Sequence, residues 1–307
     1  MRFLVSLFLS KMPWMRKASS ELIPIPPETA EALFKTGDIE GLRALATLGM
    51  AEAQVFLALC YSSGRGLRQD NIKAVNWFRK AARKGYPVAQ YNLGICYAKG
   101  KGVEENHVEA AKWYRMAAEQ GDRSAQCNLG VCYALGQGMP QDQIEAVRWY
   151  LKAAEQGDAE AQCNLGQCYI HGQGVPLNDV EAEKWFRLSA LQGFAGGLYN
   201  LGVCCSEGRG APQDHTEAVK WFRKAAEQGD TSAQLYLGHN YLHGQGVEQD
   251  FYEAYVWVNL AMLNGSSDAP KLLDEVLPNL MFFGELDEAH RRIQELQRDI
   301  QTRMTQS

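Results

Sequence analysis

The fold is decided by a stretch of 36 residues, 123–158, which reads RSAQCNLGVCYALGQGMPQDQIEAVRWYLKAAEQGD. In its first half Ala125 and Leu129 are four residues apart, which places both side chains on one face of a helix. The second half has the same spacing at Ala146 and Tyr150. The stretch therefore predicts two helices that form an antiparallel pair.

The same pattern recurs at a fixed distance along the chain. Tryptophans stand at every thirty-sixth residue, at Trp77, Trp113, Trp149, Trp185, Trp221 and Trp257. A constant period of this length is typical of a solenoid, in which each unit packs on its neighbours. We predict an all-α solenoid of six 36-residue helix-turn-helix repeats, with the tryptophans as core residues of the second helices. The repeats span 51–86, 87–122, 123–158, 159–194, 195–230 and 231–266.

Glycines and acidic residues mark the ends of the predicted helices. Gly136 and Gly138 follow the first helix of the third repeat, where a left-handed residue suits glycine. Asp142 and Glu145 then form a variant of the capping box at the start of the second helix. Gly130 stands in the middle of the first helix at a cost of about 1 kcal/mol relative to alanine. We interpret it as room for a bulky ring of the neighbouring helix.

The repeated pattern Ala-Gln-x-x-Leu-Gly-x-x-Tyr-x-x-Gly-x-Gly-Val-x-x-Asp, followed by Glu-Ala-x-x-Trp-Phe-x-x-Ala-Ala-Glu-Gln-Gly, resembles the Sel1-like repeat over residues 51–266. That repeat is related to the tetratricopeptide repeat and has a longer loop between its helices. The resemblance implies a right-handed α/α superhelix with the first helices lining the concave side. It also implies a scaffold or adaptor for protein complexes, while some bacterial members act in exopolysaccharide assembly or host interaction.

The segments outside the repeats divide into three parts. Residues 28–50 are expected to form N-terminal capping helices, and 267–307 C-terminal capping helices, because solenoid ends must be covered. Residues 1–27 are expected to be a flexible lead-in or a weak targeting segment, with no transmembrane span. A cytoplasmic protein is expected. The alternative is an exported or periplasmic one if residues 1–20 act as a signal.

Composition and motifs exclude several classes of function. A net charge of −5 argues against a nucleic-acid partner, which needs a basic surface. Eight cysteines are expected to be buried free thiols, since repeat-equivalent positions lie too far apart for disulfides. His239 and His243 share a helical face but lack a third metal ligand, so no metal site is expected. No catalytic motif appears, and no catalytic residue or cofactor is expected.

Candidate recognition residues share one position of the first helices. Four of these positions form an asparagine ladder: Asn92, Asn128, Asn164 and Asn200. Amides can grip an extended peptide backbone, although buried amides more often serve internal hydrogen bonds. Phe56 and Tyr236 replace asparagine in the first and last repeats and would offer aromatic anchors in the groove.

The sequence thus favours a non-catalytic scaffold that binds a protein or peptide in the groove of the solenoid. Two alternatives remain open: a hydrolase of cell-envelope material, and an exported factor in surface assembly or host interaction. A monomer is expected, with a dimer through the amphipathic C-terminal helix as the alternative.

Overall fold

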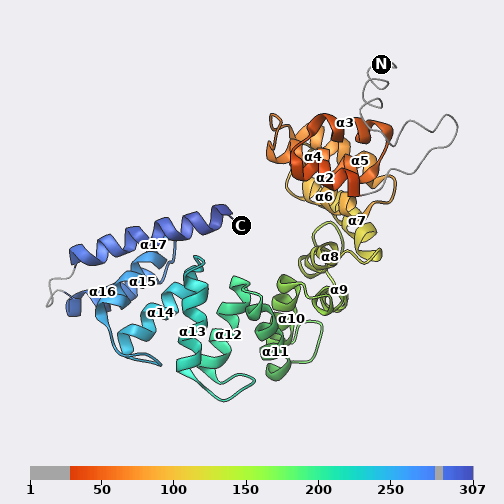
Figure 1. Cartoon of the computed structure of the whole chain (residues 1–307). Coiled ribbons are helices and arrows are strands. Elements are labelled where there is room, and N and C mark those ends of the chain that lie inside the picture. The colour runs from red at the N-terminus through yellow and green to blue at the C-terminus, as the bar shows by residue number, and fades with distance from the viewer. Residues whose placement is uncertain (1–27, 281–285, 307) are drawn as a thin grey trace, which may run out of the picture. The chain divides into compact units, whose positions relative to one another are not determined.

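Every regular element in residues 28–280 and 286–306, which the computed structural model describes, is an α-helix (Figure 1). The first helices of the repeats are α4 (Ala51–Ser63), α6 (Pro87–Ala98), α8 (Arg123–Leu135), α10 (Ala159–His171), α12 (Ala195–Glu207) and α14 (Thr231–His243). The second helices are α5 (Asn71–Ala82), α7 (His107–Glu119), α9 (Gln143–Glu155), α11 (Asp179–Leu191), α13 (His215–Ala226) and α15 (Phe251–Leu263). The predicted all-α solenoid is confirmed.

Additional helices stand at both ends of the repeats. Helices α2 (Glu28–Thr36) and α3 (Ile39–Leu48) precede α4, and α16 (Ala269–Leu280) and α17 (Leu286–Gln306) follow α15. The predicted lead-in, 1–27, lies outside the described residues. No helix in the described part is long and apolar enough to cross a bilayer.

The helices belong to two compact units, Met1–Glu105 and Asn106–Ser307. In the first unit, Leu42, Leu45 and Leu57 form a buried core between the N-terminal helices and α4. In the second unit, one buried cluster lies among α8, α9 and α10, and a larger one extends from α10 to α17. Burial of these apolar side chains is the main force that holds the helices together.

Each second helix begins at the side-chain cap that the sequence predicts. In the fifth repeat the Asp214 side chain accepts a hydrogen bond from the Glu217 backbone N–H at 2.9 Å. The backbone N–H of Asp214 instead donates to the Cys205 carbonyl, at 2.8 Å. The glutamate side chain is therefore not needed for the reciprocal half of a capping box, and it is left to make other contacts.

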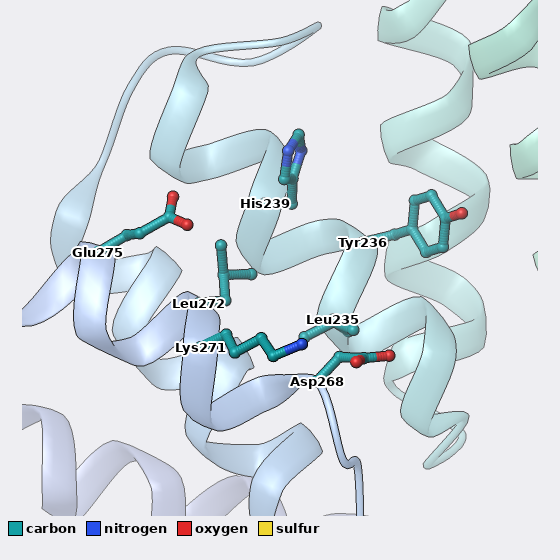
Figure 2. Close-up of a pocket in the computed structure, with 7 residues that line it drawn as sticks. All are labelled: Leu235, Tyr236, His239, Asp268, Lys271, Leu272 and Glu275. Carbon is teal, nitrogen blue, oxygen red and sulfur yellow. The ribbon is translucent and has the colours of Figure 1, made fainter.

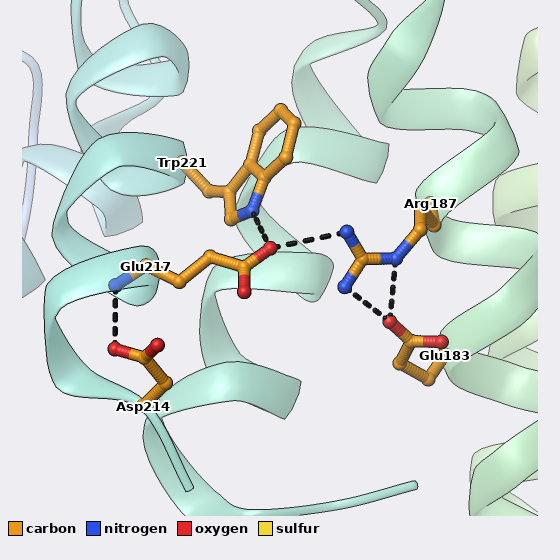
Figure 3. Close-up of polar contacts among 5 residues, drawn as sticks. All are labelled: Glu183, Arg187, Asp214, Glu217 and Trp221. Atoms are coloured by element: carbon orange, nitrogen blue, oxygen red, sulfur yellow. Dashed lines mark hydrogen bonds and ion pairs between the residues drawn. The ribbon is translucent and has the colours of Figure 1, made fainter. Parts of the chain in front are cut away.

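The Glu217 side chain links α13 to α11, the second helix of the preceding repeat (Figure 3). It accepts hydrogen bonds from Trp221 Nε1 at 3.1 Å and from Arg187 Nη1 of α11 at 3.0 Å. Arg187 also forms an ion pair with Glu183, 2.6 Å from Nη2 to Oε1. The Trp221 hydrogen bond, followed by the Arg187 contact, lowers the pKa of the Glu217 carboxyl. The network therefore stabilises the α11–α13 contact while Glu217 is ionised.

The mid-helix glycines allow close packing inside repeats three to six. A methyl group placed on Gly130 would lie 2.6 Å from the ring carbon Cδ1 of Tyr150, which is much closer than real contacts. Gly166 has the same relation to Phe186. The expected close approach is confirmed, but the ring belongs to the residue after the tryptophan.

The predicted core placement of the tryptophans holds for Trp257, while the other five are less deeply buried. Trp257 is 3% exposed, whereas Trp77, Trp113, Trp149, Trp185 and Trp221 are only half-buried at the edge of the core. The fully buried ring is one residue later, as at Phe78 and Phe222. Lysine ammonium groups lie over four of the indoles, with the shortest distances to a ring centroid 3.9 Å from Lys80 Nζ and 4.0 Å from Lys152 Nζ.

Candidate functional site

The asparagine ladder lies half-buried on the first helices. Each of three amides donates to the carbonyl of the preceding turn: Asn92 to Val88 at 2.8 Å, Asn128 to Ser124 at 3.0 Å and Asn200 to Gly196 at 2.7 Å. These hydrogen bonds lie within one helix. They occupy amide N–H donors that would otherwise be available to the backbone carbonyls of a bound peptide. At least part of the ladder's hydrogen-bonding capacity therefore serves the fold.

In the second unit the ladder also connects neighbouring first helices. The Asn200 amide lies 3.6 Å from Cys163 Sγ, and its Oδ1 accepts a hydrogen bond from Gln167 Nε2 at 2.6 Å. Asn164 makes a longer contact, 4.0 Å, with Cys127 Sγ. These contacts fill the seams between α8, α10 and α12.

Some ladder acceptors remain available to a ligand. Among the described residues, no donor reaches Oδ1 of Asn92, Asn128 or Asn164. An amide oxygen of this kind can accept a hydrogen bond from the backbone N–H of another chain.

The two aromatic replacements have different surroundings. Phe56 stacks on Phe34 of α2 with ring centroids 4.8 Å apart, so an N-terminal helix already covers it. Tyr236 stacks on Phe222 at 5.1 Å but remains 37% exposed. Tyr236 is thus the more exposed of the two aromatic residues at this position.

Beside Tyr236 the chain forms an open cavity of about 460 Å³ between α14 and α16, which we call the terminal cavity (Figure 2). Its α14 side consists of Leu235, Tyr236 and His239. Its α16 side consists of Lys271, Leu272 and Glu275, together with Asp268 just before the helix.

The repeat period explains which side chains meet in this cavity. Leu272 stands 36 residues after Tyr236, and Glu275 stands 36 residues after His239. The buried Leu273 likewise corresponds to the buried Leu237. Helix α16 is therefore the first helix of an incomplete seventh repeat. At the contact between α14 and α16, Leu272 occupies the position that Asn200 has in α12. The amide contacts that Asn200 makes with α10 are therefore absent between α14 and α16.

The cavity combines apolar and charged groups. Burial lowers the pKa of His239, the neighbouring His243 lowers it further, and Glu275 opposes both. The two histidine rings meet edge to face with centroids 4.3 Å apart. Because its pKa lies below the usual value near 6.5, the imidazole of His239 is mainly neutral at pH 7.

Among the described residues, no group of three potential ligands is placed to hold a metal ion.

Sequence reasoning found Tyr236 but missed the other side of the cavity. Lys271, Leu272 and Glu275 lie in a segment that was considered only as a cap. The signal that could have found them is the 36-residue step, since Ala269 and Leu273 continue the register of Ala233 and Leu237.

The cysteines offer no reactive group to this surface. All eight are free and buried, as the sequence predicts. Burial raises the pKa of Cys132 to about 11 and that of Cys163 to about 12. A protonated thiol is a poor nucleophile and a poor metal ligand, so these side chains act as small core residues.

Comparison with known proteins places this architecture in a family. The model of the Sel1 repeat matches residues 51–86, 87–122, 123–158, 159–194, 195–230 and 231–266. These limits are the ones that the 36-residue period gives. Sel1 repeats commonly mediate protein–protein interaction and are generally non-catalytic scaffolds. No curated protein matches the chain.

Solved structures agree with this assignment. The chain is 34% identical, with a TM-score of 0.73, to c5321, a protective antigen of uropathogenic Escherichia coli strains that displays an SLR fold. The match covers 86% of this chain but 56% of c5321, so the chain spans little more than half of that protein. A Sel1 repeat protein from Oxalobacter formigenes is 31% identical, with a TM-score of 0.71, over 76% of this chain and 96% of its own length. The chain belongs to the Sel1 repeat family.

Proposed function

We propose that the chain is a non-catalytic scaffold that binds an extended segment of a partner protein along its first helices. The surface in question is formed by α8, α10, α12, α14 and α16 of the second unit, and we call it the first-helix face. It includes the asparagine ladder of that unit, Tyr236 and the terminal cavity.

The contrast between buried and exposed positions of the first helices carries the proposal. Leu129, Leu165 and Leu201 are fully buried and identical from repeat to repeat. The exposed position six residues later is not constant and is occupied by Leu135, His171, Glu207 and His243. A constant frame with varied exposed side chains suits recognition of a segment that runs across several repeats.

Site-specific photo-crosslinking in the native cell tests this proposal. A photoreactive amino acid at Leu135 or Glu207 is expected to capture a partner protein. The same group at Lys220, which is exposed on the second helix α13, is the matched control. Capture from Lys220 but from neither first-helix position would overturn the proposal.

The ladder has its own variant in the same experiment. The double change Asn128→Ala and Asn164→Ala removes two available amide oxygens and is expected to reduce capture at Leu135. A variant that keeps the wild-type melting temperature and full capture would remove the ladder from the proposed site.

A further inference from the structure

The terminal cavity carries a more specific inference about the partner. Leu235, Leu272 and the exposed ring of Tyr236 supply apolar surface, which gains free energy when another apolar group covers it. Around this surface stand two carboxylates, Asp268 and Glu275, with one ammonium group, Lys271 (Figure 2). In the described part of the chain no ion pair or hydrogen bond engages these three charged side chains.

We propose that the terminal cavity binds an apolar side chain of the partner segment together with an adjacent arginine. The apolar side chain covers Leu235 and Leu272, and the guanidinium group pairs with Glu275. The inference rests on the proposed function, since it names the chemistry of the segment that the first-helix face would bind.

Charge favours a basic residue over an acidic one. A cation in the cavity meets two carboxylates and one ammonium group, whereas an anion meets the reverse balance. His239, beside Glu275 in the cavity, is held mainly neutral near pH 7 and does not repel a cation there. The net charge of −5 also attracts basic segments over a longer range.

Geometry favours arginine over lysine. A guanidinium group makes two parallel hydrogen bonds to a carboxylate such as Glu275, which an ammonium group cannot do. The apolar stem of the side chain adds contact with the leucines.

The test uses the full chain with labelled leucine methyl groups and a synthetic peptide, acetyl-Gly-Ser-Gly-Leu-Arg-Gly-Ser-Gly-amide. NMR titration is expected to shift the Leu235 and Leu272 methyl signals in a saturable way. Two comparison peptides carry glutamate in place of arginine, or glycine in place of leucine. Each is expected to bind at least about fivefold more weakly, which corresponds to about 1 kcal/mol.

Charge reversal on α16 supplies the matched variants. Glu275→Lys is expected to weaken binding of the leucine–arginine peptide about tenfold. Asp274→Lys makes the same charge change at the neighbouring exposed residue, which does not line the cavity, and is expected to keep most of the affinity. Equal loss in both variants, or equal binding of the glutamate peptide, would overturn the inference.

The outcome separates this inference from the proposed function. If a partner is captured at Leu135 or Glu207 but no peptide shifts the Leu235 and Leu272 methyl signals, the scaffold proposal stands and the cavity inference fails. If the peptides bind selectively but neither first-helix position captures a protein, the proposed function fails while the cavity keeps its preference for arginine.

Discussion

At the scale of the residue, the glycine in the middle of the first helices of repeats two to six shows how packing overrides helix propensity. Alanine at this position would favour the helix by about 1 kcal/mol. The methyl group would also lie 2.6 Å from the Tyr150 ring and 3.2 Å from the Ala146 carbonyl, at Gly130. Overpacking of this kind costs about 1–3 kcal/mol, and the better helix propensity of alanine offsets part of this cost.

We therefore expect Gly130→Ala to lower the free energy of unfolding by about 1–2 kcal/mol, measured by urea denaturation. Tyr150→Leu removes the ring that the methyl group would meet. The double variant should lose less stability than the sum of the two single variants, because the added methyl group then finds space. Strict additivity would show that the ring is not the reason for glycine.

The buried cysteines give a second prediction for single residues. The thiolate is the reactive form, and burial raises the pKa of Cys132, Cys168 and Cys205 to about 11. Near pH 8 the native protein should therefore react slowly with a thiol reagent, while all eight cysteines react quickly in concentrated guanidinium chloride. Fast reaction of the native protein would contradict the buried placement.

The sequence predicts the spacing of equivalent residues better than it predicts how deeply each side chain is buried. The 36-residue step identifies Trp149 and Tyr150 as a recurring pair but does not tell which ring enters the core. The structure places Tyr150 inside, 4% exposed, because its ring occupies the space left by Gly130. That space is a property of two helices together, so the period of one helix does not reveal it.

At the scale of the helix, buried glutamines join five of the six first helices to the helix that precedes them. Gln162 donates from Nε2 to the Ala154 carbonyl near the end of α9, at 3.1 Å, and its Oε1 accepts from Gln192 at 2.8 Å. Equivalent bonds to the preceding helix recur at Gln54, Gln90, Gln126 and Gln234. The sequence pattern alone does not reveal their burial, because a glutamine near the start of a helix is typical of an exposed position.

We expect Gln162→Leu to reduce the free energy of unfolding by about 1–2 kcal/mol, because it removes the buried hydrogen bond to the Ala154 carbonyl of α9 and the contact with the exposed Gln192 side chain. Repeat five carries Leu198 at the same position, where Ser189 packs against Gly197. Leu198→Val is the matched control, since it removes apolar volume without breaking a polar contact. Unchanged stability of Gln162→Leu would show that the glutamine bonds contribute nothing net.

The last seam shows the limit of prediction at this scale. The sequence indicates that 269–280 is helical and amphipathic, and its register with α14 is readable from Ala269 and Leu273. Whether a seam closes or leaves a cavity depends on how two helices are spaced and tilted. Leu272 cannot make the amide contacts of Asn200, and the resulting opening appears only in three dimensions.

At the scale of the whole molecule, the C-terminal helix packs within the chain. Ala289, Ile293 and Ile300 of α17 are buried, and His290 meets the Tyr255 hydroxyl at 3.1 Å. The apolar stripe that suggested a dimer is therefore already covered by the protein's own core. A dimer through Ala289 and Ile293 would require α17 to leave α15 and expose this core.

The repeat architecture makes a prediction about deletions, because each repeat packs on its immediate neighbours. Removal of residues 159–194 joins Asp158 to Ala195 and keeps the 36-residue register. In the intact chain the Asp158 side chain caps α10 by accepting a hydrogen bond from the Ala161 N–H at 2.9 Å. After the deletion Gly197 takes the place of Ala161. Ala153 of α9 likewise takes the place of Ser189, the residue packed against Gly197, and the smaller side chain fits there.

The shortened chain should therefore fold with the same helical content per residue and unfold in a cooperative but weaker transition, measured by circular dichroism. Removal of residues 177–194 instead takes away α11 alone, and with it the core residues Ala182 and Phe186 that share a buried cluster with Ile170 of α10. That variant should lose cooperative unfolding. If both deletions behaved alike, the 36-residue repeat would not be the unit of folding, and stability would have to come from contacts that span several repeats.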